Sequence, residues 1–492
     1  MIYVNLANQD FKYEIYELIK VFFFGEEIIF IDDREEYHGI GLLIENRLIK
    51  EGNKVDSLLK IYDDNKLIYE SKEKDLQSID IGEDNPKRKI RIGVKKGLYE
   101  GLIHISNIKA PWGILTGIRP AKIVHGLLDN EIQEDNIRNI LLNEYKISSE
   151  KVNLILNICK RQRKYLYPLN ENRFSLYIDI PFCPSRCLYC SFPSCNINKY
   201  SKYVDEYTDK LIYEINNIKD IMRGKSISTV YIGGGTPTAI PMENLDRIIL
   251  SIYDNFGREN IEEITVEAGR PDTISKEMLK MLNKNNIDRI SINPQTMNDN
   301  TLKLIGRKHN SMDIVKSYYL AKEIGFNIIN MDLIIGLPGE GLREIQNTLN
   351  EIQKLNPENL TVHTLAIKRG SKFIETMDKY PIKDQAIIGE MLQKTESFSK
   401  YMKLYPYYLY RQKQILGNFE NIGYAKKGNE CVYNIKMMEE KETIMAAGMG
   451  AVSKIFFPKE NRIERAPNVK SLEEYLNRTE EMLKRKVQAL NG

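Results

Sequence analysis

The chain has 492 residues, of which 42% are hydrophobic and 28% are charged, and 71 basic against 68 acidic side chains leave a net charge of +3. This composition provides enough apolar material for a sizeable core and excludes intrinsic disorder as the main state. The near balance of charge argues against electrostatic nucleic-acid binding, which needs a basic excess. At about 150 residues per domain, the length predicts about three domains.

The start of the chain lacks the basic and apolar stretches of a secretory signal. The longest apolar runs, such as residues 21–24, are far shorter than the about 20 residues that span a bilayer. We therefore expect a cytoplasmic protein with no membrane span. Its six cysteines should be reduced there, and four of them fall between Cys183 and Cys195. Such a thiol cluster is typical of metal binding or catalysis.

Residues 1–165 are expected to form a separate α+β domain of unknown role. The run SLLKIYDDNKLIYES predicts a β-hairpin that turns at Asp63–Lys66. The stretch from Glu131 to Arg163 has a mostly helical pattern.

From Phe174 onward, short β-branched runs alternate with amphipathic helical stretches, which is typical of a parallel sheet. The six expected strands are Ser175–Phe182, Thr229–Gly235, Glu263–Ala268, Arg289–Gln295, Asn327–Gly336 and Asn359–Ala366. Six units are fewer than the eight of a closed barrel, so we predict an α/β fold, an open (β/α)6 partial TIM barrel over residues 166–375. Residues 376–492 should form a C-terminal extension with a strand at Tyr405–Tyr410 and a helix near Leu472–Lys486.

Cys183, Cys187 and Cys190 form a CxxxCxxC motif directly after the first expected strand. Active sites of (β/α) barrels lie at the C-terminal ends of the strands, so this loop is the candidate site. Thiolates select zinc or iron–sulfur centres. A closed zinc site needs four ligands, for which Cys195 is the candidate fourth. We favour a 4Fe–4S cluster on the three close cysteines, because it leaves one iron free for another ligand.

Further motifs follow the later strands. Residues 231–238 read YIGGGTPT, whose glycines allow the backbone to approach a ligand closely. Glu267 ends the third strand, and Asp332 lies within an otherwise apolar fifth strand, where an unpaired carboxylate is costly. We expect Asp332 to have a dedicated partner, either a ligand or Arg307. The two histidines at positions 309 and 363 are expected to pack or hydrogen-bond rather than to act as ligands.

A CxxxCxxC motif after a first strand and a glycine-rich second strand together resemble the radical S-adenosylmethionine (SAM) superfamily. There, the free iron binds SAM, one electron cleaves the sulfonium, and the resulting 5′-deoxyadenosyl radical abstracts hydrogen. The full series is similar to oxygen-independent coproporphyrinogen III oxidase, also called coproporphyrinogen III dehydrogenase, and is most like the HemZ branch. The series reads YIDIPFCPSRCLYC, YIGGGTPT, TVEAGRPDT, SINPQT, LIGRKHN and MDLIIGLPGE.

This resemblance implies the oxidative decarboxylation of two propionates of coproporphyrinogen III to vinyl groups, which gives protoporphyrinogen IX in haem biosynthesis. It implies a 4Fe–4S cluster on Cys183, Cys187 and Cys190 and two SAM molecules. The implied partners are the porphyrinogen and a reductase or a ferredoxin- or flavodoxin-type electron donor, and we expect a monomer. The implied SAM contacts are Tyr177, Gly234 and Glu267 at the first molecule, and Tyr189, Gly235, Thr236, Gln295, Arg307, Asp332 and Ala366 at the second.

The chain departs from the family pattern at two positions in its first motif. Asp179 stands where the family usually carries a histidine, and Phe192 stands where it usually carries a fourth cysteine. Haem chaperones on the same barrel are the main rival interpretation, although they carry a ligating His-Asn pair where this chain has Tyr433 and Asn434. The motifs are also compatible with a radical SAM methyltransferase, and the cysteines alone with a structural zinc protein.

Overall fold

The computed structural model describes residues 1–108, 110–117, 119–368, 370, 371, 373, 384–412 and 416–492. The chain forms two compact units, one of Met1–Cys159 with Gly417–Phe419 and one of Lys160–Leu416 with Glu420–Gly492. The predicted boundary between barrel and C-terminal segment, at residues 375 and 376, lies outside the described residues. In the described ranges, no helix has the length and apolar character needed to cross a membrane.

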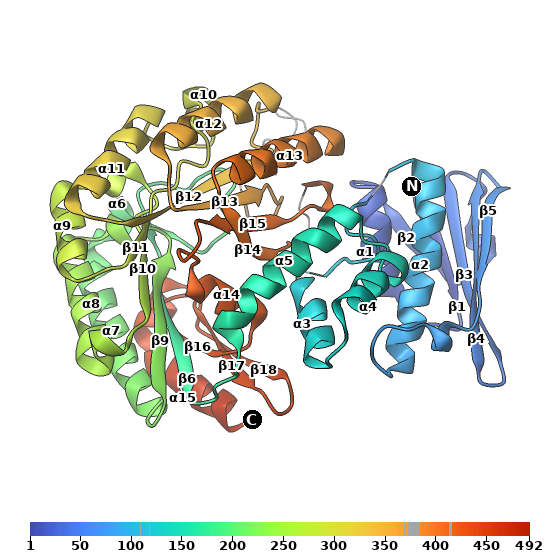
Figure 1. Cartoon of the computed structure of the whole chain (residues 1–492), viewed down its shortest axis with the longest axis horizontal. Coiled ribbons are helices and arrows are strands. Elements are labelled where there is room, and N and C mark those ends of the chain that lie inside the picture. Colours follow the sequence, from blue (N-terminus) through green and yellow to red (C-terminus); the bar gives the residue numbers. More distant parts are fainter. Residues whose placement is uncertain (109, 118, 369, 372, 374–383, 413–415) are drawn as a thin grey trace. The chain divides into compact units, whose positions relative to one another are not determined.

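The first unit is built on a five-stranded sheet in the order β2-β1-β3-β4-β5 (Figure 1). β1 pairs in parallel with β2 and β3, whereas β3, β4 and β5 are antiparallel. The predicted hairpin is confirmed, because Asp64 and Asn65, both at positive φ, form the two-residue turn between β4 and β5. The strands are β1 (Ile2–Ala7), β2 (Ile28–Ile31), β3 (Leu42–Glu51), β4 (Lys54–Asp63) and β5 (Lys66–Glu73).

The long helix α2 carries glycines at every fourth position: Gly97 and Gly101 face β4 and β5, and Gly93 faces Leu76 and Ile79 in the segment after β5. A Cβ at Gly101 would lie 2.9 Å from Ile61 Cδ1, so the missing side chains bring the helix close to the sheet. The helices of this part are α1 (Lys12–Phe22), α2 (Pro86–Ser106), α3 (Ala121–Asp129), α4 (Glu134–Asn139) and α5 (Ser149–Leu166), whose last turns belong to the second unit.

The second unit contains a sheet of eleven strands in the order β14-β15-β13-β12-β11-β10-β9-β6-β16-β17-β18. The six predicted strands are its centre, and they pair in parallel with one another. Over the described residues the order has two distinct ends, so the predicted open α/β barrel is confirmed. The central strands are β6 (Arg173–Ile180), β9 (Ser226–Gly234), β10 (Glu263–Glu267), β11 (Arg289–Ser291), β12 (Ile328–Ile335) and β13 (Asn359–Thr364).

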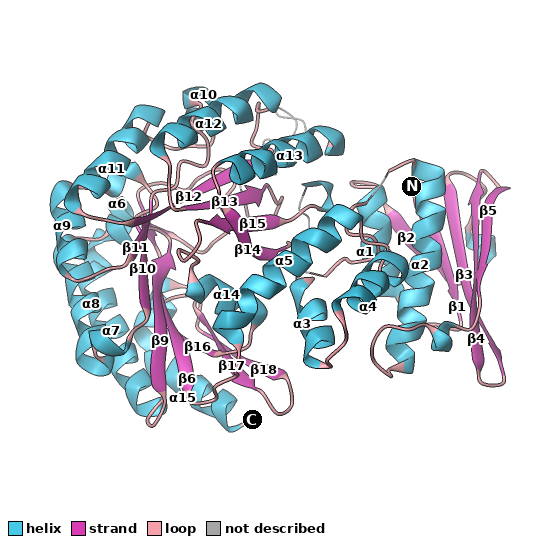
Figure 2. Cartoon of the chain, viewed as in Figure 1, coloured by secondary structure: helices cyan, strands magenta, loops and turns pink. Residues whose placement is uncertain are grey.

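Helices cover the outer face of this sheet (Figures 1 and 2). Their buried residues recur at helical spacing, as Leu245, Ile248, Ile249 and Ile252 do in α8. These helices are α7 (Val204–Ile221), α8 (Met242–Phe256), α9 (Lys276–Lys284), α10 (Asp299–Leu304), α11 (Ser311–Ile324) and α12 (Leu342–Leu355).

The C-terminal part extends the central sheet at both edges. β15 (Asn421–Ala425) pairs antiparallel with β13 and with β14 (Tyr405–Tyr410), and β16 (Thr443–Ala447) pairs in parallel with β6. The sequence does not predict β16, because all five of its residues are buried and its sequence shows no alternation. The remaining elements are α6 (Ile197–Tyr200), α13 (Gln385–Tyr401), α14 (Val432–Glu439), β17 (Val452–Phe457), β18 (Arg462–Pro467) and α15 (Leu472–Asn491).

A buried ion pair attaches α15 to the barrel. Lys486 Nζ lies 2.7 Å from Glu214 Oε1 on α7, and both side chains are fully buried. Glu214 also accepts hydrogen bonds from Asn468 Nδ2, from the Tyr475 hydroxyl and from the Gly448 N–H, at 2.7 to 2.9 Å. One carboxylate thus connects α7, α15 and the loop that follows β16.

Replacing Lys486 by methionine should lower the free energy of unfolding by about 3 kcal/mol, because it leaves a buried carboxylate without its cation. Chemical denaturation of the full chain measures this loss. Lys484→Met is the matched control, since Lys484 is exposed on the same helix and its replacement should cost less than about 0.5 kcal/mol. Equal effects of the two variants would contradict the structural role of the pair.

Candidate active site

The three motif cysteines lie on a loop at the carboxyl end of β6. Two short strands bracket this loop, β7 (Phe182–Cys183) and β8 (Cys195–Asn196), and Cys187 and Cys190 lie between them. The backbone N–H of Cys190 donates to the Cys187 carbonyl at 3.1 Å, which closes a tight turn between these two residues. The loop therefore holds its three thiols at the end of the barrel where the parallel strands finish.

Glycines at the end of β9 allow the backbone to approach this loop. A Cβ at Gly235 would lie 2.9 Å from Cys183 Sγ, and one at Gly234, whose φ is +110°, would lie 2.6 Å from Asp179 Oδ1. The next residue contributes its hydroxyl, because Thr236 Oγ1 lies 3.6 Å from Cys183 Sγ. Gly234 and Gly235 therefore leave room for Asp179 and Cys183, and a larger side chain at either position would collide with them.

Cys195 lies on the opposite face of the β7–β8 pair from Cys183. It pairs with Phe182 across β7 and β8, so its side chain projects from the opposite face to that of Cys183. Burial, together with the Asp179 carboxylate, raises the pKa of the Cys195 thiol. The register therefore argues against Cys195 as the fourth ligand of a shared zinc ion.

The donor set fits an iron–sulfur cluster. Within the described ranges, no three His, Cys, Asp or Glu side chains gather closely enough to hold one metal ion. A cubane cluster sets a different requirement, because each thiolate binds its own iron. Burial raises the pKa of Cys183 to about 11 and also raises that of Cys190. Metal binding must therefore displace thiol protons.

A second group of side chains joins the ends of β6, β9 and β10. The Tyr177 hydroxyl donates to Asp179 Oδ2 at 3.2 Å, and the Tyr231 hydroxyl donates to Glu267 Oε1 at 2.7 Å. Burial raises the pKa of Glu267 to about 7, and the charge of Asp332 adds to the rise, while the Tyr231 hydroxyl opposes it. Near neutral pH this carboxyl is therefore protonated in part of the molecules and ionised in the rest. The ionised form is able to accept a hydrogen bond from a ligand.

Asp332 has a dedicated partner, but it is not Arg307. Asn330 Nδ2 donates to Asp332 Oδ1 at 2.7 Å, and His363 Nε2 lies 3.7 Å from Asp332 Oδ2. Burial acts to raise the pKa of Asp332, but His363 and Asn330 outweigh burial and the pKa is lowered. His363 also lies 3.1 Å, by its Nδ1, from the Tyr410 hydroxyl, which confirms its predicted hydrogen-bonding role.

Arg307 instead belongs to a polar group beside the cysteine loop. It donates through Nη1 to the Asn293 carbonyl and through Nη2 to the Tyr189 hydroxyl, the latter at 3.3 Å. Gln295 donates its backbone N–H to the Asp332 carbonyl at 2.8 Å. Across the described residues, Gln295 Oε1, Asn293 Oδ1 and Arg307 Nε are buried without a hydrogen-bond partner. Because such atoms are costly, a polar ligand at this point would satisfy them.

The residues expected to contact SAM all come from the strands and loops at one end of the sheet. Glu267 ends β10, Asp332 lies in β12, and Ala366 follows β13. The structure brings Tyr177 next to Glu267 through Tyr231, and Tyr189 next to Arg307. For Ala366 it gives only this position at the end of its strand.

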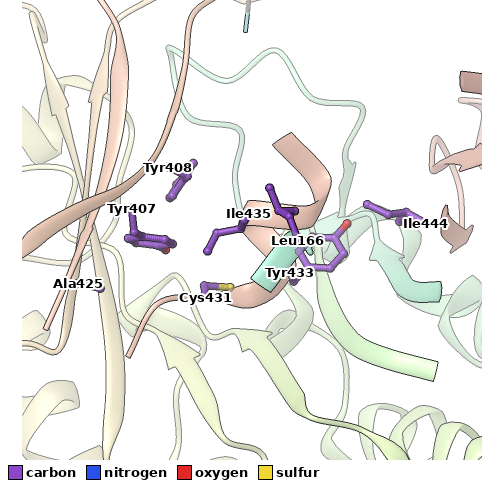
Figure 3. Packing of buried hydrophobic residues seen from close by; sticks show 8 residues of the cluster. All are labelled: Leu166, Tyr407, Tyr408, Ala425, Cys431, Tyr433, Ile435 and Ile444. Atoms are coloured by element: carbon purple, nitrogen blue, oxygen red, sulfur yellow. The ribbon is translucent and has the colours of Figure 1, made fainter. Parts of the chain in front are cut away.

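Sequence reasoning missed a stack of three tyrosines inside the barrel. The Tyr433 ring, from α14, lies 4.7 Å from the Tyr231 ring and 6.2 Å from the Tyr177 ring. Burial raises the pKa of Tyr433 well above 10, so it is a neutral phenol. Figure 3 shows the apolar cluster that surrounds it, formed by Leu166, Tyr407, Tyr408, Ala425, Cys431, Ile435 and Ile444. No local pattern indicates this stack, since its members come from three distant segments.

Comparisons with known proteins agree with this geometry. Residues 177–352 match the model of the Radical SAM superfamily. The chain is 42% identical over 390 residues to "Oxygen-independent coproporphyrinogen-III oxidase-like protein HemZ" of Bacillus subtilis, covering 78% of each protein. It is 37% identical over 213 residues to "Heme chaperone HemW" of the same organism, covering 42% of this chain and 54% of that relative.

Among solved structures, the fold is similar to that of the coproporphyrinogen III oxidase HemN from Escherichia coli, described as a radical SAM enzyme. The TM-score is 0.52 at 23% identity, over 65% of this chain and 72% of that one. Fold and motifs together define a radical SAM protein, a class that uses a 4Fe–4S cluster and SAM. Within that class, the chain belongs to the HemN/HemZ family of oxygen-independent coproporphyrinogen III oxidase-like proteins.

Cys187→Ala should reduce the iron and sulfide bound by anaerobically reconstituted protein to near zero, because it removes one of three thiolate ligands. Cys195→Ala is the matched control and should bind as much iron and sulfide as the wild type, since its thiol lies on the opposite face of the β7–β8 pair from Cys183. Metal and sulfide analysis per chain makes the comparison. If both variants bound as much iron and sulfide per chain as the wild type, the cluster assignment would be refuted.

Glu267 should make the stability of the metal-free protein depend on pH. Its folded-state pKa of about 7 lies above the ordinary value of 4.5, so the unfolded chain releases this proton first as pH rises. The free energy of unfolding should therefore decrease as the pH rises from the ordinary pKa of Glu267 to its folded-state pKa. Glu267→Gln should remove the part of this decrease that Glu267 causes. Urea denaturation at about pH 5 and about pH 8 should show the variant gaining up to about 3 kcal/mol on the wild type. If the free energies of unfolding of variant and wild type differed by the same amount at both pH values, the raised pKa of Glu267 would be contradicted.

Proposed function

We propose that this protein converts coproporphyrinogen III to protoporphyrinogen IX by oxidative decarboxylation of two propionates. The observation that carries the proposal is the cysteine loop, where Cys183, Cys187 and Cys190 share one end of the barrel and Cys195 lies on the opposite face of the β7–β8 pair from Cys183. Three thiolates satisfy three irons of a cubane and leave the fourth for SAM. The substrate is supported by the relatives, one named as coproporphyrinogen-III oxidase-like and one as coproporphyrinogen III oxidase.

The polar groups around the loop suit two SAM molecules. Tyr177, Gly234 and Glu267 would contact the one at the cluster, where the Glu267 carboxyl accepts from its amino or hydroxyl groups. Unpartnered atoms of Gln295 and Arg307 support a second molecule nearby, because a polar ligand would satisfy them. We assign that second site to Tyr189, Gly235, Thr236, Gln295, Arg307, Asp332 and Ala366.

When bound, the cluster would supply one electron for the reductive cleavage of SAM, and the resulting radical would take a hydrogen atom from the propionate. The substrate radical would then lose CO2 and pass one electron to a one-electron acceptor to form the vinyl group. The electron for SAM cleavage comes from a reductase or a ferredoxin- or flavodoxin-type donor. The protein orients the reactants and keeps water away, since phenol rings and apolar side chains line the barrel interior. Asp332 is held as a carboxylate by His363 and is available as a hydrogen-bond acceptor.

A haem chaperone is the second candidate, because relatives named as heme chaperones match part of the chain. Tyr433 argues against it, since it stands where those relatives carry a haem-ligating histidine. Its phenol is neutral and its ring packs against those of both Tyr231 and Tyr177. Haem ligation by Tyr433 would require that the stack open and the phenol lose its proton.

The test is an anaerobic product assay with reconstituted protein, a reductant, SAM and coproporphyrinogen III. We expect 5′-deoxyadenosine, protoporphyrinogen IX and CO2. Asp332→Asn should keep its iron and sulfide but lower turnover by about tenfold, as the loss of one charge-assisted hydrogen bond predicts.

The same assay, together with a haem titration of the same protein, separates the candidate functions. Release of S-adenosylhomocysteine would indicate a methyltransferase. Stoichiometric haem binding with coproporphyrinogen III left unchanged would indicate a chaperone. Either result, obtained with a fully loaded cluster, would refute the proposed reaction while leaving the cluster assignment intact.

A further inference from the structure

The guanidinium of Arg270 is buried beside one of the motif cysteines. Arg270 follows β10 and is 4% exposed. Its Nη1 lies 3.9 Å from Cys187 Sγ, within hydrogen-bonding distance for sulfur. The same nitrogen donates to the Ser185 carbonyl at 3.0 Å and to the Ser185 hydroxyl at 3.1 Å. Arg270 therefore contacts both the backbone and a thiol of the cysteine loop.

Asp272 fixes the orientation of this guanidinium. Arg270 Nε donates to Asp272 Oδ1 at 3.0 Å and Nη2 donates to Asp272 Oδ2 at 2.9 Å, which is a bidentate pair. Burial opposes ionisation of Asp272, but His309 and Arg270 outweigh it and lower its pKa, so the carboxylate is charged. His309 Nδ1 lies 3.4 Å from Asp272 Oδ1. Contacts thus run from the thiol to Arg270, then to Asp272, and on to His309.

This arrangement has a consequence for electron transfer. A reduced cluster carries one more negative charge than an oxidised one. A nearby cation and an N–H···S hydrogen bond stabilise the reduced form more, and they raise the reduction potential. Asp272 has the opposite effect, because its negative charge weakens the field of Arg270 at the cluster.

We propose that Arg270 is a positioning residue that holds the cysteine loop and raises the reduction potential of the cluster through Cys187, while Asp272 limits this rise. The inference rests on the proposed function, since it requires the cluster on Cys183, Cys187 and Cys190. It gives the chain a means to make its cluster easier to reduce by a one-electron donor. Arg307 is a second buried cation beside the loop. It donates to the Asn293 carbonyl and the Tyr189 hydroxyl and also interacts with the Cys187 thiol, and this contribution is the same in every Arg270 and Asp272 variant.

The test is a redox titration of anaerobically reconstituted full-length protein, followed by electron paramagnetic resonance (EPR) without SAM. Arg270→Gln should lower the midpoint potential, and Arg270→Lys, which keeps the charge, should lower it less. Asp272→Asn should raise the midpoint potential. Arg258→Gln is the control, because Arg258 precedes β10 and forms an ion pair with Asp288. The midpoint potential of this variant should equal that of the wild type.

Opposite shifts for the Arg270 and Asp272 variants support the proposal, since a merely structural role would not produce opposite signs. Unchanged potentials in variants that bind a full cluster overturn it. If Arg270→Gln binds no iron, Asp272→Asn decides, with an upward shift in support and no shift against. A wild-type protein that binds no cluster would refute the proposed function itself, which keeps the two failures distinct.

Discussion

The proposed cluster requires three thiols close together at one end of the barrel, and the fold of the second unit places Cys183, Cys187 and Cys190 on one loop there. The parallel sheet brings the ends of its central strands to one side, where the cysteine loop follows β6. Glycines after β9 remove the side chains that would collide with Cys183 and Asp179. Ser185 donates to the Gly306 carbonyl at one side and accepts from Arg270 at the other. The loop is thus held both by its own Cys190–Cys187 backbone bond and by contacts from neighbouring segments of the barrel.

Around this loop the barrel interior combines phenols with a few paired charges. Buried carboxyls are costly unless they are hydrogen-bonded or neutral. Glu267 has a raised pKa and accepts a hydrogen bond from Tyr231. Asp332 instead has a lowered pKa, because His363 and Asn330 stabilise its ionised form. The two carboxyls therefore differ in charge at neutral pH although both face the same interior. Such a difference lets one site accept protons while the other stays an anion.

The sequence indicates the parts whose signals are local. Alternating strands and helices predict the open barrel, and the CxxxCxxC spacing after the first strand predicts the place of the thiols. The sequence does not indicate β16, because a strand buried on both faces has no alternation. Nor does it pair Asp332 with His363 or gather the three stacked tyrosines, because these contacts join distant segments. Arg270 has no sequence signal of its own, since only the folded loop brings it to Cys187.

In the proposed mechanism, three thiolates hold a 4Fe–4S cluster whose fourth iron is open to SAM. The most direct measurement is the EPR spectrum of the reduced, fully loaded protein, recorded before and after SAM is added. We predict that SAM changes the spectrum, because its amino and carboxylate groups bind the free iron. A spectrum that stays the same at saturating SAM would contradict an open iron and the chemistry that depends on it.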